Sequence, residues 1–167
     1  MKILRSIAAI LVGAIVAVVA IGLIQMISNV MSPPPPGFDW RNQEQVRAHV
    51  GSLPWTAFAI VLCSYIAGSL VGGGVAAALA SCCRVVHAGV IGALVLAMTV
   101  GNFAMLKYSM GVGHPDWMIV ASLLSPLPVS MMAGKLVAAL MAPPAAVENP
   151  PPAVGAFKSG EPPVRST

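Results

Sequence analysis

Residues 64–80, SYIAGSLVGGGVAAALA, carry a small side chain at every fourth position: Ser64, Gly68, Gly72, Ala76 and Ala80. On a helix these positions share one face, because residues i and i+4 are neighbours. Glycine costs a helix in water about 1 kcal/mol relative to alanine, but in a bilayer it lets helix backbones approach closely. The stretch therefore predicts a membrane helix that packs through this face. The alternative is that the glycines line a pore.

The composition predicts an integral membrane protein. Of 167 residues, 57% are hydrophobic and 8% are charged, and the mean hydropathy is +0.87. A soluble domain has about 25% charged residues, and so short a chain could not bury this much apolar surface. The net charge of +4 comes from scattered Lys and Arg residues. We therefore expect these charges to face lipid headgroups and expect no nucleic-acid partner.

Four apolar segments predict an all-α membrane protein, a four-transmembrane-helix bundle within residues 1–142. The expected spans are about 4–28, 54–80, 88–106 and 117–141. The first could instead be a signal peptide, but its uncharged run is about twice a typical apolar region, so we expect it to be retained. Small side chains at helical spacing predict further packing residues: Gly13, Gly89, Ala93, Ala97, Gly101, Ser130 and Gly134. Pro126 and Pro128 predict a kink in the last span.

The loop after the first span predicts a short interfacial helix. Prolines 33–36 cannot continue a helix. Asn42 is a plausible N-cap, with Gln45 placed to complete a capping box. One face of the following segment is apolar, at Val46, Val50 and Leu53. At the other end of the chain, residues 143–167 contain seven prolines and predict a disordered Pro-rich tail.

The charge distribution predicts the orientation. Four spans put both termini on one side, together with Lys2, Arg5, Arg84, Lys135, Lys158 and Arg165. The other side has half as many cations: Arg41, Arg47 and Lys107. Because cytoplasmic loops carry the excess of Lys and Arg, we expect both termini in the cytoplasm.

Catalysis and cofactor binding are not expected. The sequence has no nucleophile elbow, phosphate loop or zinc-protease motif. All five carboxylates lie outside the expected spans, at Asp39, Glu44, Asp116, Glu148 and Glu161. No Asp, Glu, Arg or His is expected deep in a span, where ion-coupled transporters usually place them.

The histidines and cysteines do not predict a metal site or a disulfide framework. His49, His114 and Asp116 could meet as metal ligands, but they lack a ligand spacing. Three cysteines, Cys63, Cys82 and Cys83, form no CxxC motif. The adjacent pair at a helix end is either an acylation site or simply two small residues.

Polar residues inside the spans fall mainly in the outer half: Gln25, Ser64, Tyr65, Thr99, Asn102, Ser122 and Ser125. Buried polar groups in lipid seek one another or water. This distribution predicts a shallow outward-facing polar vestibule, roofed by residues 39–50 and 114–117. The alternative is that the same groups hydrogen-bond between helices and fill the space.

The chain resembles a family of small bacterial four-span membrane proteins that are themselves uncharacterised. The resemblance rests on the Pro33–Asp39 run, Gly72-Gly73 with Ala76-Ala77, and His114-Pro115 followed by Trp117, and it covers residues 1–141. It implies a bacterial inner (plasma) membrane and brings no activity with it.

Two functions stay open at the level of sequence. The first is a non-catalytic membrane protein with a structural, assembly or accessory role. Its expected partners are the lipid bilayer and either a second copy of the chain or another membrane protein. The second is a small transporter or channel subunit that uses the vestibule. A membrane enzyme is the least expected, because convergent ionisable groups are missing.

Overall fold

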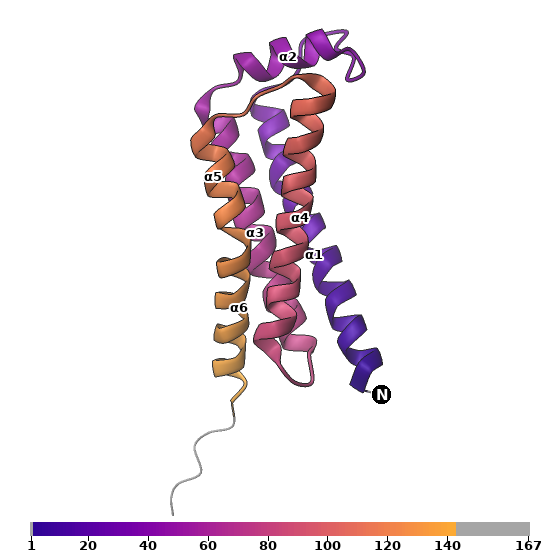
Figure 1. Cartoon of the computed structure of the whole chain (residues 1–167), viewed down its shortest axis with the longest axis vertical. Coiled ribbons are helices and arrows are strands. Elements are labelled where there is room, and N and C mark those ends of the chain that lie inside the picture. Colours follow the sequence, from indigo (N-terminus) through magenta and orange to yellow (C-terminus); the bar gives the residue numbers. More distant parts are fainter. Residues whose placement is uncertain (1, 143–167) are drawn as a thin grey trace, which may run out of the picture.

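The computed structural model describes residues 2–142, which form six α-helices (Figure 1). Their bounds are α1 (Lys2–Met31), α2 (Gln43–Ser52), α3 (Trp55–Leu79), α4 (Arg84–Met110), α5 (Asp116–Leu124) and α6 (Pro126–Leu140). The predicted fold is confirmed, since the described part of the chain has four helical segments long and apolar enough to span a membrane: α1, α3, α4 and α5–α6. The expected tail, 143–167, lies outside the described residues.

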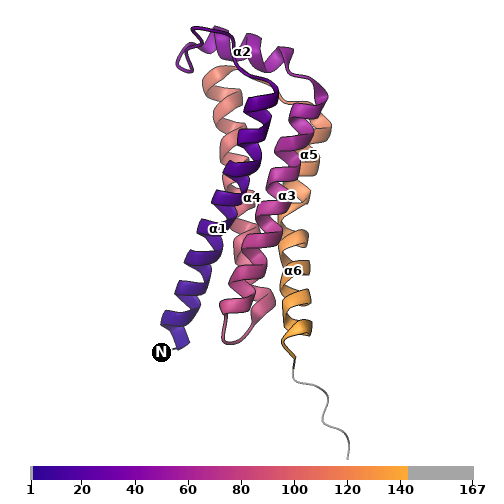
Figure 2. The same cartoon turned by 180° about the vertical axis from the view of Figure 1, so that it is seen from behind.

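The four spans run alternately up and down. The start of α1, the α3–α4 turn and the end of α6 lie at one end of the bundle, which we call the inner end (Figure 1). Helix α2 lies across the opposite, outer end, together with the loop between α4 and α5 (Figures 1 and 2). The structure thus places residues 2 and 142 at the same end.

Several helix boundaries differ from the predicted ones. The third span covers Arg84–Met110 rather than 88–106, because the preceding turn is only a few residues long. Its end is fixed by Gly111, whose φ of 61° is left-handed and suits glycine. The last span divides at Ser125 into α5 and α6, where Pro126 and Pro128 cannot donate to the carbonyls one turn earlier.

Helix α3 contacts α1, α4, α5 and α6, and it is central because two of its faces are small. The face of Ser64, Gly68, Gly72 and Ala76 is buried against α1. A methyl group added to Gly68 would lie 3.0 Å from the Ala17 carbonyl oxygen, so the two backbones are nearly in contact. The next face around the helix meets α6, where a methyl on Gly73 would lie 2.5 Å from Ser130 Oγ.

Helices α4 and α6 also pack backbone to backbone. A methyl on Gly92 would lie 2.9 Å from the Pro126 carbonyl oxygen, and one on Gly134 would lie 2.7 Å from Ala88 Cβ. The Ser130 hydroxyl donates to the Ala88 carbonyl, which satisfies a polar group that is fully buried. These contacts put Ser130 and Gly134 in the interior.

The α4 face predicted for packing requires a correction. Ala93, Ala97 and Gly101 are exposed and Gly89 is half-buried, so this face points out of the bundle. Helix α4 packs instead through Ala88, Ile91, Gly92, Val95 and Thr99. The physical reason is that α6 presents Ser130 and Gly134 to the neighbouring line of small residues on α4, and only one of the two lines can face inward.

Candidate functional site

A cavity of about 300 Å³ lies at the outer end, beneath α2 and between the outer ends of α1, α3 and α4. We call it the outer cavity. One face of α1 supplies polar residues at helical spacing: Gln25, Ser28, Asn29 and Ser32. Tyr65 is the innermost of its α3 residues and Asn102 the innermost of its α4 residues. The cavity therefore lies in the outer half and ends above the packed core that contains Ala17 and Ile91.

The inner limit of the outer cavity is a cluster of four polar side chains, Gln25, Ser64, Tyr65 and Asn102, which we call the polar floor. Gln25 Nε2 donates to Ser64 Oγ over 3.3 Å, and Ser64 Oγ donates to the Val61 carbonyl over 2.6 Å. The Tyr65 hydroxyl lies beside the side chains of Asn102 and Gln25, which line the same cavity. Each amide has two N–H donors and an acceptor oxygen, so both retain hydrogen-bonding capacity toward a ligand.

Helix α2 forms the roof. It begins because the Asn42 side chain accepts from the backbone N–H groups of Glu44 and Gln45. The prediction of a capping box is wrong in its second bond, in which the Gln45 side chain would accept from the Asn42 N–H. Gln45 Oε1 accepts from the Asp39 N–H instead. The apolar face of α2 points into the molecule, and Val46 is only 2% exposed.

Arg47 ties this roof to the loop between α4 and α5. Its Nε donates to the Gly111 carbonyl over 3.1 Å. The guanidinium lies against the Gly111 backbone, in space that a side chain there would occupy. This hydrogen bond joins two segments that are far apart in the sequence, and both lie at the outer end of the cavity.

His114 closes the side of the outer cavity near α5. Its ring lies 5.9 Å from the ring of Phe58 and 5.0 Å from that of Phe103, measured between centroids. Burial between these rings lowers the pKa of His114 below its ordinary value. The neutral imidazole is therefore the favoured form, with one nitrogen as donor and the other as acceptor.

A smaller cavity of about 160 Å³, which we call the side opening, lies between α1 and α4. It is lined by Ile21, Gln25, Tyr65, Val95, Met98 and Asn102. Met98 is 54% exposed and Asn102 is also exposed, so this opening faces outward from the bundle. It shares the amides and the phenol of the polar floor with the outer cavity.

Four residues of the predicted vestibule do not line these cavities. Ser64 is fully buried behind Gln25, and the other three lie elsewhere on their helices. Thr99 is buried and donates to the Val95 carbonyl over 2.8 Å. Ser122 and Ser125, beside the proline kink, have buried hydroxyls without a hydrogen-bond partner within the described residues. The position of a residue in the sequence predicts its depth in the membrane but not the direction in which it points from its helix. The sequence therefore could not separate these residues from Gln25 and Asn102.

The sequence did not predict several residues that line the outer cavity. Ser28 and Ser32 continue the polar face of Gln25, and their three-to-four-residue spacing was the available signal. The contacts of His114 with Phe58 and Phe103 had no signal, because they join three separate segments.

Metal chemistry and thiol chemistry do not converge on the cavity. Within residues 2–142 no group of three or more His, Cys, Asp or Glu side chains could hold a metal ion. His114 borders the outer cavity together with His49 and also borders a crevice between α4 and α5 together with Asp116, but His49 and Asp116 share no cavity. Cys63, Cys82 and Cys83 are exposed and form no part of it.

Comparison with protein-family models, with curated proteins and with solved structures finds no match to this chain. The site must therefore be interpreted from its own geometry.

Proposed function

We propose that this protein is a non-catalytic membrane protein with an accessory role, and that it acts by binding an uncharged group in the outer cavity. The carrying observation is the polar floor, where Gln25 and Asn102 have hydrogen-bonding capacity left after their contacts with Ser64 and Tyr65. A cavity with a few convergent polar groups among apolar walls is typical of a small-molecule site. We further propose a bacterial inner membrane with both termini cytoplasmic.

The residues that line the outer cavity support binding rather than reaction. They include no Asp, Glu, Lys, Arg or Cys. Nucleophilic catalysis needs a hydroxyl or thiol within hydrogen-bonding reach of a base. Among the side-chain hydrogen bonds of residues 2–142, neither the His49 nor the His114 imidazole pairs with a serine hydroxyl, since the Ser52 hydroxyl donates to the His49 backbone carbonyl and not to its ring.

A transporter or channel subunit is the second candidate, favoured by the same outward-facing cavity. The interior below the polar floor is closed by Ala17, Ala76 and Ile91, which are at most 1% exposed. Transport would therefore require a second conformation that opens the inner half. A simple accessory protein would need no such change.

Cysteine accessibility tests both. In a background without the native thiols, Asn102→Cys is exposed to a membrane-impermeant thiol reagent from the outer side. Ser122→Cys, which is buried outside the cavity, and Gly113→Cys in the exposed outer loop are the negative and positive controls. We expect Asn102→Cys to react and Ser122→Cys to stay unlabelled; equal resistance of both would overturn the cavity. Labelling of Asn102→Cys from the inner side as well, in inverted vesicles, would favour the transporter.

The accessory role also implies a neighbouring membrane helix, and the outward α4 face is the surface we propose for it. Ala93, Ala97 and Gly101 form an exposed line of small side chains on this face, and such lines favour close helix contact in lipid. A second copy of the chain would give disulfide-linked dimers of Ala97→Cys in membranes. Leu136→Cys, on an exposed position of α6, is the matched control.

A further inference from the structure

The outer cavity and the side opening meet at the polar floor. Gln25, Tyr65 and Asn102 line both of them. One cavity lies under α2 at the outer end, and the other faces outward between α1 and α4. A ligand on the polar floor can therefore be reached from the outer surface and from the side of the bundle.

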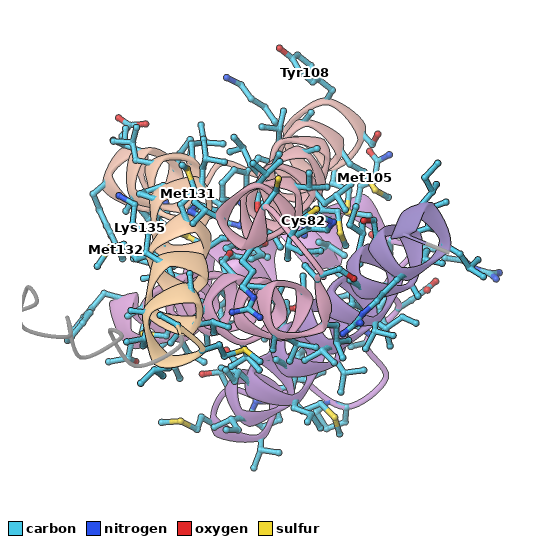
Figure 3. All side chains as sticks on the ribbon, turned by 90° about the horizontal axis from the view of Figure 1, so that it is seen from below. Cys82, Met105, Tyr108, Met131, Met132 and Lys135 are labelled. Atoms are coloured by element: carbon cyan, nitrogen blue, oxygen red, sulfur yellow. The ribbon has the colours of Figure 1, made fainter. Side chains whose placement is uncertain are left out.

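The side opening lies at the depth of the hydrocarbon. Tyr108, near the outer end of α4, is 84% exposed and points away from the bundle, as expected for a residue at the membrane interface (Figure 3). Asn102 and Met98 lie six and ten residues below it, or about 9 and 15 Å along the helix. Because the hydrocarbon core is about 30 Å thick, the opening faces lipid tails in the outer leaflet.

The chemistry changes along this passage. Apart from the polar floor, the side opening is lined by Ile21, Val95 and Met98, which suit a hydrocarbon chain. Neither cavity is lined by Asp, Glu, Lys or Arg. A charged headgroup would be buried there without a partner of opposite charge, and that is costly. A headgroup with hydroxyl or amide groups could instead replace its bonds to water with bonds to the two amides and Tyr65.

We propose that this passage binds an uncharged, single-chain amphiphile, such as a monoacylglycerol, taken from the outer leaflet. Its hydroxyl-bearing head lies on the polar floor, and its chain leaves the protein between α1 and α4. The side opening, at about 160 Å³, is close to a cavity that accepts one benzene-sized group, which favours a single chain. The proposal rests on the binding function above and specifies its ligand.

Photocrosslinking tests the proposal on the full chain in nanodiscs. The probe is a monoacylglycerol with a diazirine in its acyl chain. Met98→Trp narrows the side opening, whereas Met105→Trp changes an equally exposed methionine on the same helix that lines neither cavity (58% against 54% exposed). We expect Met98→Trp to abolish most crosslinking and Met105→Trp to leave it unchanged. Asn102→Leu should weaken labelling about tenfold, because one head-group hydrogen bond is lost.

Competition identifies the headgroup. Unlabelled monoacylglycerol should displace the probe, while a fatty acid and a lysophosphatidylcholine of the same chain length should not. Equal competition by the fatty acid would overturn the proposal, as would equal labelling of the two tryptophan variants.

The crosslinked residues can also be mapped on the unsubstituted chain, so this test does not depend on whether a variant folds. The adducts should lie on Ile21, Val95 or Met98. Adducts spread equally to Met131 and Met132, exposed on α6 (Figure 3), would show general lipid contact only and would overturn the proposal. If Asn102→Cys reacts with the thiol reagent but the crosslinks do not map to the side opening, the amphiphile fails while the outer binding cavity stands.

Discussion

Gly13 and Gly72 face each other with no room for a side chain on either. A methyl on Gly13 would lie 2.8 Å from the Gly72 carbonyl oxygen, and one on Gly72 would lie 2.7 Å from the Gly13 carbonyl oxygen. This reciprocal contact is the closest approach that antiparallel helices α1 and α3 can make. It matters because α1 contacts only α3 and α4 among the described helices.

Gly72→Leu should therefore separate α1 from α3. Overpacking a close contact costs about 1–3 kcal/mol, and here the displaced atoms are backbone. We expect a clear fall in the midpoint of thermal aggregation in detergent, measured by the fraction that stays monodisperse. Gly101→Leu is the matched control, because a methyl at Gly101 would meet nothing within 4 Å. If the two variants aggregate at the same temperature, the packing face of α3 is misplaced.

The sequence predicts where the helices lie in the chain better than it predicts which of their faces pack against one another. The apolar runs end at strong signals, such as the prolines before α2 and the left-handed Gly111 after α4. On α4, however, two adjacent lines of small residues begin at Ala88 and Gly89, and the longer line is the exposed one. Spacing alone cannot choose between them, since the choice depends on the shape of α6.

The candidate site shows the same limit. Gln25, Tyr65 and Asn102 meet because their helix faces converge, whereas Thr99 bonds within its own helix. From the sequence, all four are expected at similar depths in the membrane. The hydrophobic pattern cannot resolve these rotations, because in lipid the outer face of a helix is as apolar as the inner face.

Tyr65→Phe should weaken the polar floor without changing its shape. It removes a hydroxyl that is placed to hydrogen-bond with Asn102 and Gln25, in a residue only 5% exposed. Such hydrogen bonds between membrane helices contribute about 0.6 kcal/mol on average and at most about 1.7 kcal/mol. We expect a small loss in the free energy of unfolding and a larger loss of monoacylglycerol crosslinking. Tyr108→Phe, on a residue 84% exposed, should change neither.

Arg47→Ala should release α2 from the loop between α4 and α5. The lost bond, from Arg47 Nε to the Gly111 carbonyl, is exposed, so the cost should stay below about 1 kcal/mol. Hydrogen exchange of residues 43–52 should nevertheless become faster, because within residues 2–142 no other side-chain hydrogen bond joins α2 to that loop. Arg41→Ala removes an equal charge from the same segment between α1 and α3, and it should leave the exchange rate of residues 43–52 unchanged. If both variants accelerated exchange equally, the loss of positive charge alone would explain the effect.

The orientation can be tested with reporters. The structure places the end of α6 and the α3–α4 turn at one end and the α4–α5 loop, which contains Gly113, at the other (Figure 1). The positive-inside rule puts the first end in the cytoplasm. A fusion after Ala142 should give a cytoplasmic signal, and an insertion at Gly113 should give an external one. The reverse pair of signals would turn the outer cavity toward the cytoplasm and remove its access to the outer leaflet.

Acid should loosen the loop that carries His114. Burial between Phe58 and Phe103 lowers the pKa of His114, so the packed loop favours the neutral ring. Above the ordinary value of about 6.5 the ring is neutral whether the loop is packed or open, and the packing is fully retained. As the pH falls below that value the open loop takes up a proton more readily, and the packed loop loses stability until the pH passes the lowered pKa.

Amide exchange of residues 111–115, corrected for its intrinsic pH dependence, measures this effect between pH 7 and pH 5. Other ionisable groups face the same ring: Lys107 and Asp116 in the crevice between α4 and α5, and His49 and Tyr65 across the outer cavity. His114→Phe keeps an aromatic ring in place and should abolish the loss of protection at pH 5. His49→Gln, whose native ring contacts Phe38 instead, should retain that loss. If His114→Phe still loses protection at pH 5, protonation of His114 does not loosen the loop and the prediction is wrong.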